Sequence, residues 1–129
     1  MVTNISGYSD ILIAMEKAVQ RLKALGEPTR LRMLALLRHG ERCVCDLMAV
    51  LDMPQSSVSR HLSVLRSAGW VAARKGGTWT YYSLHPEGEG AWGPFLDSLL
   101  DCLASEAQAT EDQRVLAEFL KTKDPNACA

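Results

Sequence analysis

Apolar residues recur three and four positions apart in several stretches of the chain, the spacing that gathers side chains on one face of a helix. This pattern predicts helices over 10–25, 28–38, 44–51 and 55–68, a fifth that starts near residue 91 and stays apolar to 103, and a last one through 115–120. Ser9 or Asp10 can cap the first helix. Gly26 ends that helix, and Pro28 opens the next at a position where its missing N–H costs little. A capping-box pattern at 110–113 predicts the start of the last helix.

The hydrophobic period changes after residue 69. Residues 70–75 and 78–84 are rich in aromatic and β-forming residues, and they flank Gly76-Gly77, which supplies the positive φ angles of a tight hairpin turn. Just before this hairpin, two short helices are joined by about three residues, an order typical of a helix-turn-helix. The pattern therefore predicts a mainly α-helical fold with a small β-hairpin wing, a winged helix-turn-helix.

The helix predicted over 55–68 has two contrasting faces. Apolar residues form one stripe, whereas small serines and one arginine form the opposite stripe, which suits the DNA major groove. The basic residues beside the hairpin tip are placed to contact phosphates. The candidate DNA-binding residues are Gln55, Ser56, Ser57, Ser59, Arg60 and His61 on the helix, with Arg74 and Lys75 on the wing.

The distribution of charge supports this prediction, although the net charge is only −1. Residues 28–75 carry eight Lys or Arg against three acids, a balance of +5, and the remainder has a balance of −6. A basic segment between acidic flanks is the electrostatic pattern expected of DNA binding. The alternative is a solvated surface with uneven charge.

Other classes of protein have less support. No apolar run approaches the roughly 18–20 residues needed to span a bilayer, and the first residues lack the pattern of a signal peptide. Four irregularly spaced cysteines do not resemble a secreted disulfide framework, so we expect a cytoplasmic protein. No Cys/His or Ser/His/Asp constellation indicates a nucleophile with its base, so we expect no enzyme.

Cys43 and Cys45 place two soft thiols two residues apart at the start of the helix predicted over 44–51. Thiolates bind soft metal ions and metalloids, and the helix N-terminus and Arg42 would stabilise them. Positions i and i+2 of a regular helix point about 200° apart, so coordination by both thiols should unwind the start of this helix. The alternatives are two small buried residues, or a redox switch that uses the pair or Cys102.

Four ordered motifs resemble those of the ArsR/SmtB family of winged-helix repressors. They are Leu25-Gly26-Glu27-Pro28-Thr29-Arg30-Leu31, the box Glu41-Arg42-Cys43-Val44-Cys45-Asp46-Leu47, the recognition helix from Gln55 to Leu65, and Tyr81-Tyr82-Ser83-Leu84. The resemblance covers about 22–84. It implies a homodimer that binds operator DNA, represses resistance genes and lets go when a toxic metal or metalloid binds. Within a single domain of residues 1–129, we expect 28–84 to bind DNA and the helices over 10–25 and 91–121 to form the dimer.

The ligand is expected to be As(III) or Sb(III), held by Cys43 and Cys45. Relatives that sense zinc carry His and acid pairs on the fifth helix, which has no His here, and relatives that sense cadmium or lead add cysteines near the N-terminus, where this chain has none. Where arsenic-sensing relatives often have a third cysteine, this chain has Met48. The third ligand stays open between a small exogenous thiol or hydroxide, Met48, Cys102 and Cys128. A redox-responsive repressor, or one that responds to cadmium, lead or zinc, is the alternative function.

Overall fold

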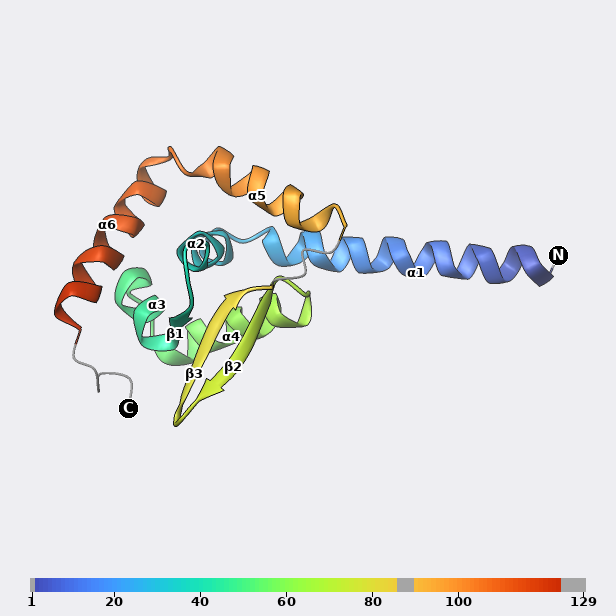
Figure 1. The fold of residues 1–129 in the computed structure, drawn as a ribbon. Helices are drawn as coiled ribbons and strands as arrows, with labels where there is room; N and C mark the ends of the chain where they lie inside the picture. The colour runs from blue at the N-terminus through green and yellow to red at the C-terminus, as the bar shows by residue number, and fades with distance from the viewer. Residues whose placement is uncertain (1, 86–89, 124–129) are drawn as a thin grey trace.

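The computed structural model describes residues 2–85 and 90–123, with side chains described from residue 10 onward. Its elements are α1 (Val2–Leu25), α2 (Pro28–Leu37), β1 (Arg42–Cys43), α3 (Val44–Leu51), α4 (Gln55–Ser67), β2 (Val71–Gly76), β3 (Trp79–Leu84), α5 (Trp92–Leu103) and α6 (Ala107–Thr122) (Figure 1). The predicted mainly helical, winged helix-turn-helix fold is confirmed. The helices predicted over 28–38, 44–51 and 55–68 lie within one residue of their observed bounds.

Helices α2, α3 and α4 surround a common apolar core. Met33 and Leu34 of α2, Leu47 of α3, and Leu62 and Leu65 of α4 are all at most 1% exposed. Full burial of such a side chain contributes about 1.5–3 kcal/mol relative to leaving it in water. This shared core holds α3 and α4 against each other, so the outer face of α4 is presented from a rigid support.

The wing is a three-stranded antiparallel sheet with the strand order β1-β3-β2. Strand β1, which the sequence analysis did not predict, pairs Arg42 with Tyr82 and Cys43 with Tyr81. Two residues are too few to show a strand period, so only the pairing reveals this strand. The β2–β3 hairpin pairs Gly76 with Trp79, which moves the turn one residue beyond the predicted Gly76-Gly77.

Helix α1 is longer than predicted and projects beyond the rest of the molecule (Figure 1). It begins at Val2, so neither Ser9 nor Asp10 caps it, because both lie within the helix. Several large apolar side chains of its outer part are 41–61% exposed, namely Ile11, Leu12, Ile13, Met15, Val19 and Leu22. Even so, no helix in the described parts of the chain is both long and apolar enough to cross a membrane.

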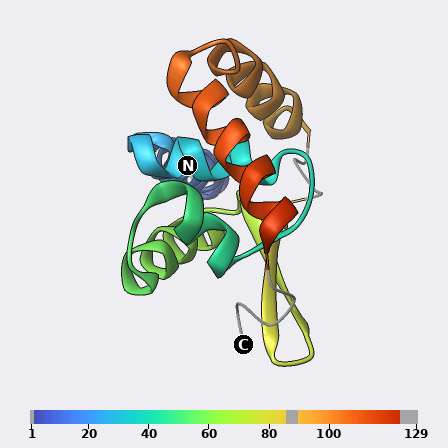
Figure 2. The ribbon, with the colours of Figure 1, turned by 90° about the vertical axis from the view of Figure 1, so that its left-hand side faces the viewer.

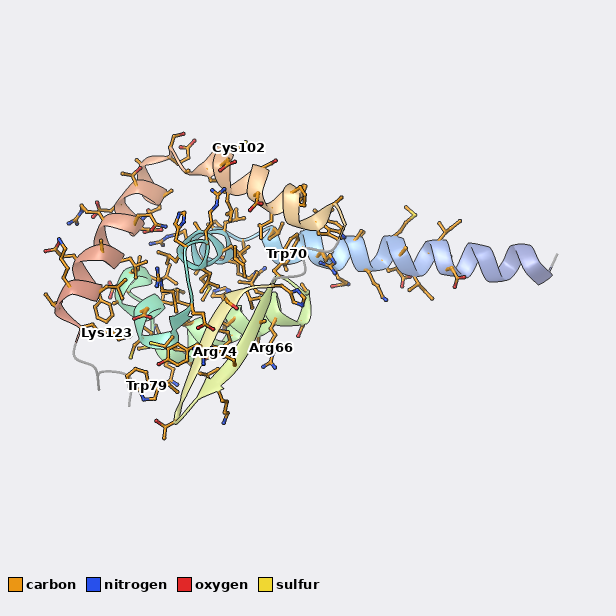
Figure 3. The ribbon with its side chains drawn as sticks, in the orientation of Figure 1. Arg66, Trp70, Arg74, Trp79, Cys102 and Lys123 are labelled. Carbon is orange, nitrogen blue, oxygen red and sulfur yellow. The ribbon has the colours of Figure 1, made fainter. Side chains whose placement is uncertain are left out.

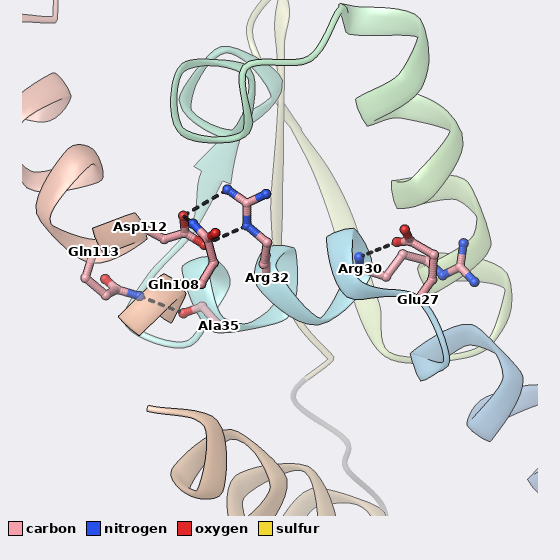
Figure 4. A network of polar contacts seen from close by, with 7 residues as sticks. All are labelled: Glu27, Arg30, Arg32, Ala35, Gln108, Asp112 and Gln113. Carbon is pink, nitrogen blue, oxygen red and sulfur yellow. Dashed lines mark hydrogen bonds and ion pairs between the residues drawn. The ribbon is translucent and has the colours of Figure 1, made fainter. Parts of the chain in front are cut away.

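Helix α6 runs across α2 and α3 (Figure 2). It begins at Ala107, so the capping box predicted at 110–113 is wrong. Asp112, a member of that predicted box, is 3% exposed and accepts two hydrogen bonds of 2.9 Å from the guanidinium of Arg32 on α2 (Figure 4). Gln108 also donates to Asp112, and Gln113 donates to the carbonyl of Ala35. These polar contacts fasten α6 to α2.

Trp70, at the start of the wing, joins α1 and α5 to the core. Its indole N–H donates to the carbonyl of Arg21 on α1 at 2.8 Å. Its ring meets Trp92 of α5 edge-on at 5.7 Å between centroids, and the Arg21 guanidinium lies 5.3 Å from the centroid of Trp92. Aromatic pairs of this geometry contribute about 0.5–1.5 kcal/mol beyond the area they bury.

Candidate functional site

Cys43 and Cys45 lie on two different elements. Cys43 ends β1 and is the N-cap of α3, with an extended backbone (φ −90°, ψ 171°), and it is 2% exposed. Cys45 is half-buried in the first turn of α3. Because Cys43 is outside the helix, the expectation that the two thiols point about 200° apart on a regular helix does not apply. Unwinding of α3 is therefore not required for both to face one ligand.

Both cysteines line one cavity of about 290 Å³ at the junction of α3, α4 and the wing. Its other lining residues are Val44 and Met48 of α3, Gln55 and Ser59 of α4, and Thr78, Trp79, Thr80 and Tyr82 of the hairpin. This cavity is thus lined both by the cysteines predicted to bind a ligand and by two residues predicted to face DNA, Gln55 and Ser59.

The cation beside Cys43 is Lys123, at the end of α6. Its ammonium donates to the sulfur of Cys43 at 3.3 Å and to Asp46 Oδ1 at 2.7 Å, and it lies 5.6 Å from the centroid of the Trp79 ring. Burial alone would lower the pKa of Lys123, but the hydrogen bonds to Asp46 and Cys43 outweigh it and raise that pKa. Figure 3 shows Lys123 and Trp79 near each other at the end of α6.

Asp46 completes this arrangement. It is 3% exposed, and its Oδ2 accepts the backbone N–H of Cys43 at 2.9 Å. The sequence analysis named Arg42 as the nearby cation, whereas the guanidinium of Arg42 donates to the carbonyl of Glu41. Lys123 was missed because it is 80 residues from Cys43 along the chain, and no local pattern connects them.

The remaining cysteines differ in position. Cys102 is exposed on α5, well away from Lys123 and Trp79 in Figure 3. Cys128 lies outside the described residues. Among residues 2–85 and 90–123, no three His, Cys, Asp or Glu side chains come together as a metal site. Cys45 is disulfide-bonded in this structure, so the pair can act as two thiols only after reduction.

Helix α4 presents part of the predicted DNA-binding set at its surface. Gln55, Ser56 and Arg60 are exposed, and Ser57 and Ser59 are half-buried. These side chains follow one another along the first two turns of the helix, next to the cavity that holds the cysteines. The polar face predicted for this helix is therefore accessible at its N-terminal half.

His61 is placed differently from the prediction. It is 8% exposed, and its Nδ1 lies 3.3 Å from Arg30 Nη1 and 4.0 Å from Glu27 Oε2. Glu27 in turn caps α2 by accepting the backbone N–H of Arg30 at 2.9 Å (Figure 4). A buried imidazole that faces Arg30 and Glu27 at the start of α2 does not offer a donor to DNA. The assignment of His61 to the DNA-binding set is therefore corrected to a structural role between α2 and α4.

On the wing, Arg74 and Lys75 are both exposed. Arg74 makes a two-pronged ion pair with Glu41, with hydrogen bonds of 2.7 and 2.8 Å, and its guanidinium lies 4.8 Å from the centroid of Tyr81. The hydrogen bonds from Arg74 lower the pKa of Glu41. The pair connects the residue two positions before Cys43 to the surface of the hairpin.

Comparison with known proteins agrees with this arrangement. The family described as "Bacterial regulatory protein, arsR family" matches residues 27–73. The Arsenic resistance transcriptional regulator ArsR1 of Pseudomonas putida is 40% identical over 109 residues, covering 83% of this chain and 84% of that protein. The Arsenical resistance operon repressor of Escherichia coli is 39% identical over 92 residues, covering 70% and 79%.

A solved structure is also similar. The homodimeric winged helix-turn-helix DNA-binding domain from Mycobacterium bovis, described as a possible ArsR-family transcriptional regulator, superposes with a TM-score of 0.63 at 30% identity. The match covers 74% of this chain and 85% of that domain.

Proposed function

Because this chain belongs to the arsR family of bacterial regulatory proteins, we propose that trivalent arsenic or antimony is its inducer. Membership of this family makes the chain a DNA-binding metalloregulatory repressor and not an enzyme. In this proposal a homodimer binds operator DNA and dissociates from it when Cys43 and Cys45 bind the metalloid. The observation that carries the proposal is the cavity that both cysteines share with Gln55 and Ser59 of α4.

The donor set fits this class of ligand. Two thiols are soft donors, which favour thiophilic ions over the hard cations that prefer oxygen. Arsenic in its trivalent state accepts as few as two protein thiols plus an exogenous ligand, and a small thiol or hydroxide can complete the site. The neutral thioether of Met48, which lines the same cavity, is a poor substitute for a thiolate on a trivalent ion. A closed zinc site, in contrast, needs about four N, S or O ligands.

The residues around Cys43 and Cys45 suggest how ligand binding to the two thiols can affect DNA binding. Lys123 and Asp46 hold Cys43 from one side, and Gln55 and Ser59 lie on another wall of the same cavity. Any change in the position of the Cys43 sulfur must be accommodated by these neighbours, because the core beneath α3 and α4 is buried and apolar, and protein cores are closely packed. Gln55 and Ser59, two residues of the proposed DNA-facing surface, line the same cavity as the Cys43 sulfur and can respond to that change.

The DNA-binding surface in this proposal comprises Gln55, Ser56, Ser57, Ser59 and Arg60 of α4 with Arg74 and Lys75 of the wing. The unit over 28–84 supplies this surface, and the helices over 10–25 and 91–121 supply the dimer contact within the single domain of residues 1–129. Exposed apolar side chains on α1, together with Phe95 of α5 at 41% exposure, support this division.

The test is arsenite titration of reduced protein bound to the DNA upstream of its own gene. Arsenite should release the wild-type protein, whereas Cys43→Ser and Cys45→Ser should bind DNA almost as tightly as wild type and resist release. Cys102→Ala and Cys128→Ala serve as matched controls and should respond like wild type, with and without glutathione. Release of the Cys43→Ser or Cys45→Ser variant by arsenite, or loss of response in either control, would contradict the two-thiol site.

A second candidate function is a thiol redox switch on the same DNA-binding fold. It is favoured by one observation, the disulfide bond of Cys45. A mild oxidant would then release the operator without any metalloid, and a thiol reductant would restore binding. Release of the wild-type protein by oxidant but not by arsenite, with the oxidant response lost in Cys45→Ser, would favour this second candidate over the first.

A further inference from the structure

Another cavity, of about 400 Å³, lies between the end of α1 and the last turns of α4, and it shares no lining residue with the cavity that holds the two cysteines. Lys23 of α1 and Arg30 of α2 supply two positive charges to its walls, and Gln20, Ser63 and Ser67 supply neutral hydrogen-bonding groups. No acidic side chain is among the described residues that line it. Cations and hydroxyls around a hollow without carboxylates suit an anionic ligand.

Both cations of this cavity keep donors for a ligand. The guanidinium of Arg30 donates to the carbonyls of Ala24 and Lys23, and its Nη1 lies 3.3 Å from Nδ1 of His61. Within the described structure these contacts use three of the five N–H groups of a guanidinium, which leaves two. Lys23 is exposed, and none of the ion pairs between described residues includes its ammonium. Glu27, which caps α2, does not line the cavity.

The cavity continues the polar stripe of α4. Ser56, Arg60, Ser63 and Ser67 are spaced three or four residues apart, which places them on one face of the helix, and all of them are exposed. Ser56 and Arg60 belong to the proposed DNA-binding surface, whereas Ser63 and Ser67 line the cavity. A DNA strand that follows this face beyond Arg60 therefore reaches the cavity.

We propose that this cavity takes a phosphate group of the DNA backbone, with Lys23 and Arg30 as its cations and Ser63 and Ser67 as hydroxyl donors. The inference rests on the proposed DNA-binding surface and extends it from α4 to α1. Val64, which is 38% exposed and lines the same cavity, suits the apolar part of the adjoining deoxyribose. Phosphate contacts fix the register of a protein on the duplex without reading its sequence. Helix α1 thus carries both the proposed dimer contact and a contact to the DNA backbone.

The experiment titrates the full-length protein with operator and with unrelated DNA over a range of salt concentrations. The informative variant is Lys23→Gln, and its matched control is Lys17→Gln, which removes the same charge from an exposed position of the same helix outside the cavity. One phosphate contact contributes about 0.9 to the slope of log affinity against log salt. Lys23→Gln should therefore reduce this slope by about one for each protomer bound and weaken both DNAs about three- to tenfold. Lys17→Gln should leave the slope unchanged, and sedimentation velocity should show that both variants are dimeric.

Operators that each carry one neutral methylphosphonate distinguish a bound phosphate from a diffuse effect of charge. At the contacted position this change should weaken binding of the wild type about three- to tenfold and of Lys23→Gln less than about twofold. Lys23→Gln would overturn the contact if it lost as much affinity as wild type at every position, kept the wild-type salt slope or became monomeric.

A free phosphate ion has the same chemistry, so inorganic phosphate is also titrated into the protein without DNA at constant ionic strength. Phosphate binding that Lys23→Gln abolishes, together with an unchanged salt slope on DNA, would assign the cavity to a free anion and overturn the backbone contact. Weakening of operator binding by Arg60→Ala but not by Lys23→Gln would overturn this inference alone. Operator binding unchanged by either substitution would instead overturn the proposed DNA-binding surface.

Discussion

Lys123 illustrates how much of the candidate site depends on one residue outside the sequence motif. The side chains of Lys123 and Asp46 are only 16% and 5% exposed, and the Lys123 ammonium forms an ion pair with the Asp46 carboxylate. Removing one member of a buried charge pair leaves the other without compensation, which is costly.

We therefore expect Lys123→Met to lower the free energy of unfolding by about 1–3 kcal/mol, because Asp46 loses a charged donor. The measurement is urea denaturation followed by circular dichroism. Lys121→Met is the matched control, since Lys121 is exposed in the last turn of the same helix, and it should change stability by less than about 0.5 kcal/mol. Equal effects of the two substitutions would show that the Lys123–Asp46 pair contributes nothing specific.

Arg60 and His61 are neighbours with opposite environments, the first exposed and the second 8% exposed. Arg60→Ala should weaken operator binding by about 1–3 kcal/mol and leave stability unchanged. His61→Ala should instead lower stability by about 1–3 kcal/mol, because it removes a buried polar partner of Arg30 and Glu27, with little effect on operator affinity. Operator anisotropy and urea denaturation separate the two effects. A folded His61→Ala variant that binds DNA as weakly as Arg60→Ala would restore His61 to the DNA-binding set.

At the scale of elements, the sequence predicts what local chemistry determines. The bounds of α2, α3 and α4 follow from Pro28, the turn before Gln55 and the apolar spacing, and the structure agrees with them. The start of α1 was wrong because Ser9 and Asp10 were taken as caps, although both residues are also tolerated within a helix.

What could not be predicted depends on contacts between distant segments. Strand β1 exists only through its pairing with β3. Helix α6 starts before its predicted box, and Asp112 of that box pairs with Arg32 on α2 instead of capping a helix. The same holds for the site. The sequence motif indicates Cys43 and Cys45 as ligands, but it does not show that Cys43 lies outside the helix. Nor does it show that Lys123 at the end of α6 contacts Cys43 and lies over Trp79 of β3.

The wing carries an internal competitor for DNA phosphates, because Glu41 holds the guanidinium of Arg74. Glu41→Gln should release Arg74 and tighten binding to all DNA sequences alike, with a steeper dependence on salt. Arg74→Ala should weaken all sequences alike and reduce the salt slope by about one. Salt titrations of binding to operator and unrelated DNA provide the measurement. Selective loss of operator binding by Arg74→Ala would instead indicate base recognition.

The pH dependence of the tighter DNA binding expected for Glu41→Gln follows from the pKa of Glu41, which the hydrogen bonds from Arg74 hold below its ordinary value of 4.5. A carboxylate with a lowered pKa in the folded state keeps its pairing above its unfolded pKa and loses it only as the pH falls through the folded value. The difference between wild type and Glu41→Gln should therefore stay constant from neutral pH down to about pH 5. If the difference in DNA affinity between wild type and Glu41→Gln disappeared between pH 7 and 6, a titrating side chain other than Glu41 would be responsible.

At the scale of the whole molecule, α1 exposes apolar side chains where it projects from the body (Figure 1). If these side chains form the dimer contact, Ile11→Glu combined with Met15→Glu should dissociate the dimer, because four-residue spacing puts both on one face of the helix. Sedimentation velocity measures the change. Lys17→Glu, about a third of a turn or more away from that face, is the control and should remain dimeric.

Operator binding should fall with the dimer, since a helix-turn-helix dimer reads two half-sites one helical turn apart. A monomeric variant that bound operator as tightly as wild type would contradict the proposed role of the dimer.

The central claim is that the cavity beside Cys43 and Cys45 couples ligand binding to DNA binding through α4. Coupling between two sites is reciprocal, so operator DNA must weaken arsenite binding by the same factor by which arsenite weakens operator binding. The most direct measurement is the affinity of reduced protein for arsenite with and without saturating operator. A decrease of about 5–150-fold on operator is the predicted result for wild type, and Cys43→Ser should bind arsenite poorly whether or not operator is present. Equal arsenite affinity in the presence and absence of operator would show that the cavity does not link the two sites.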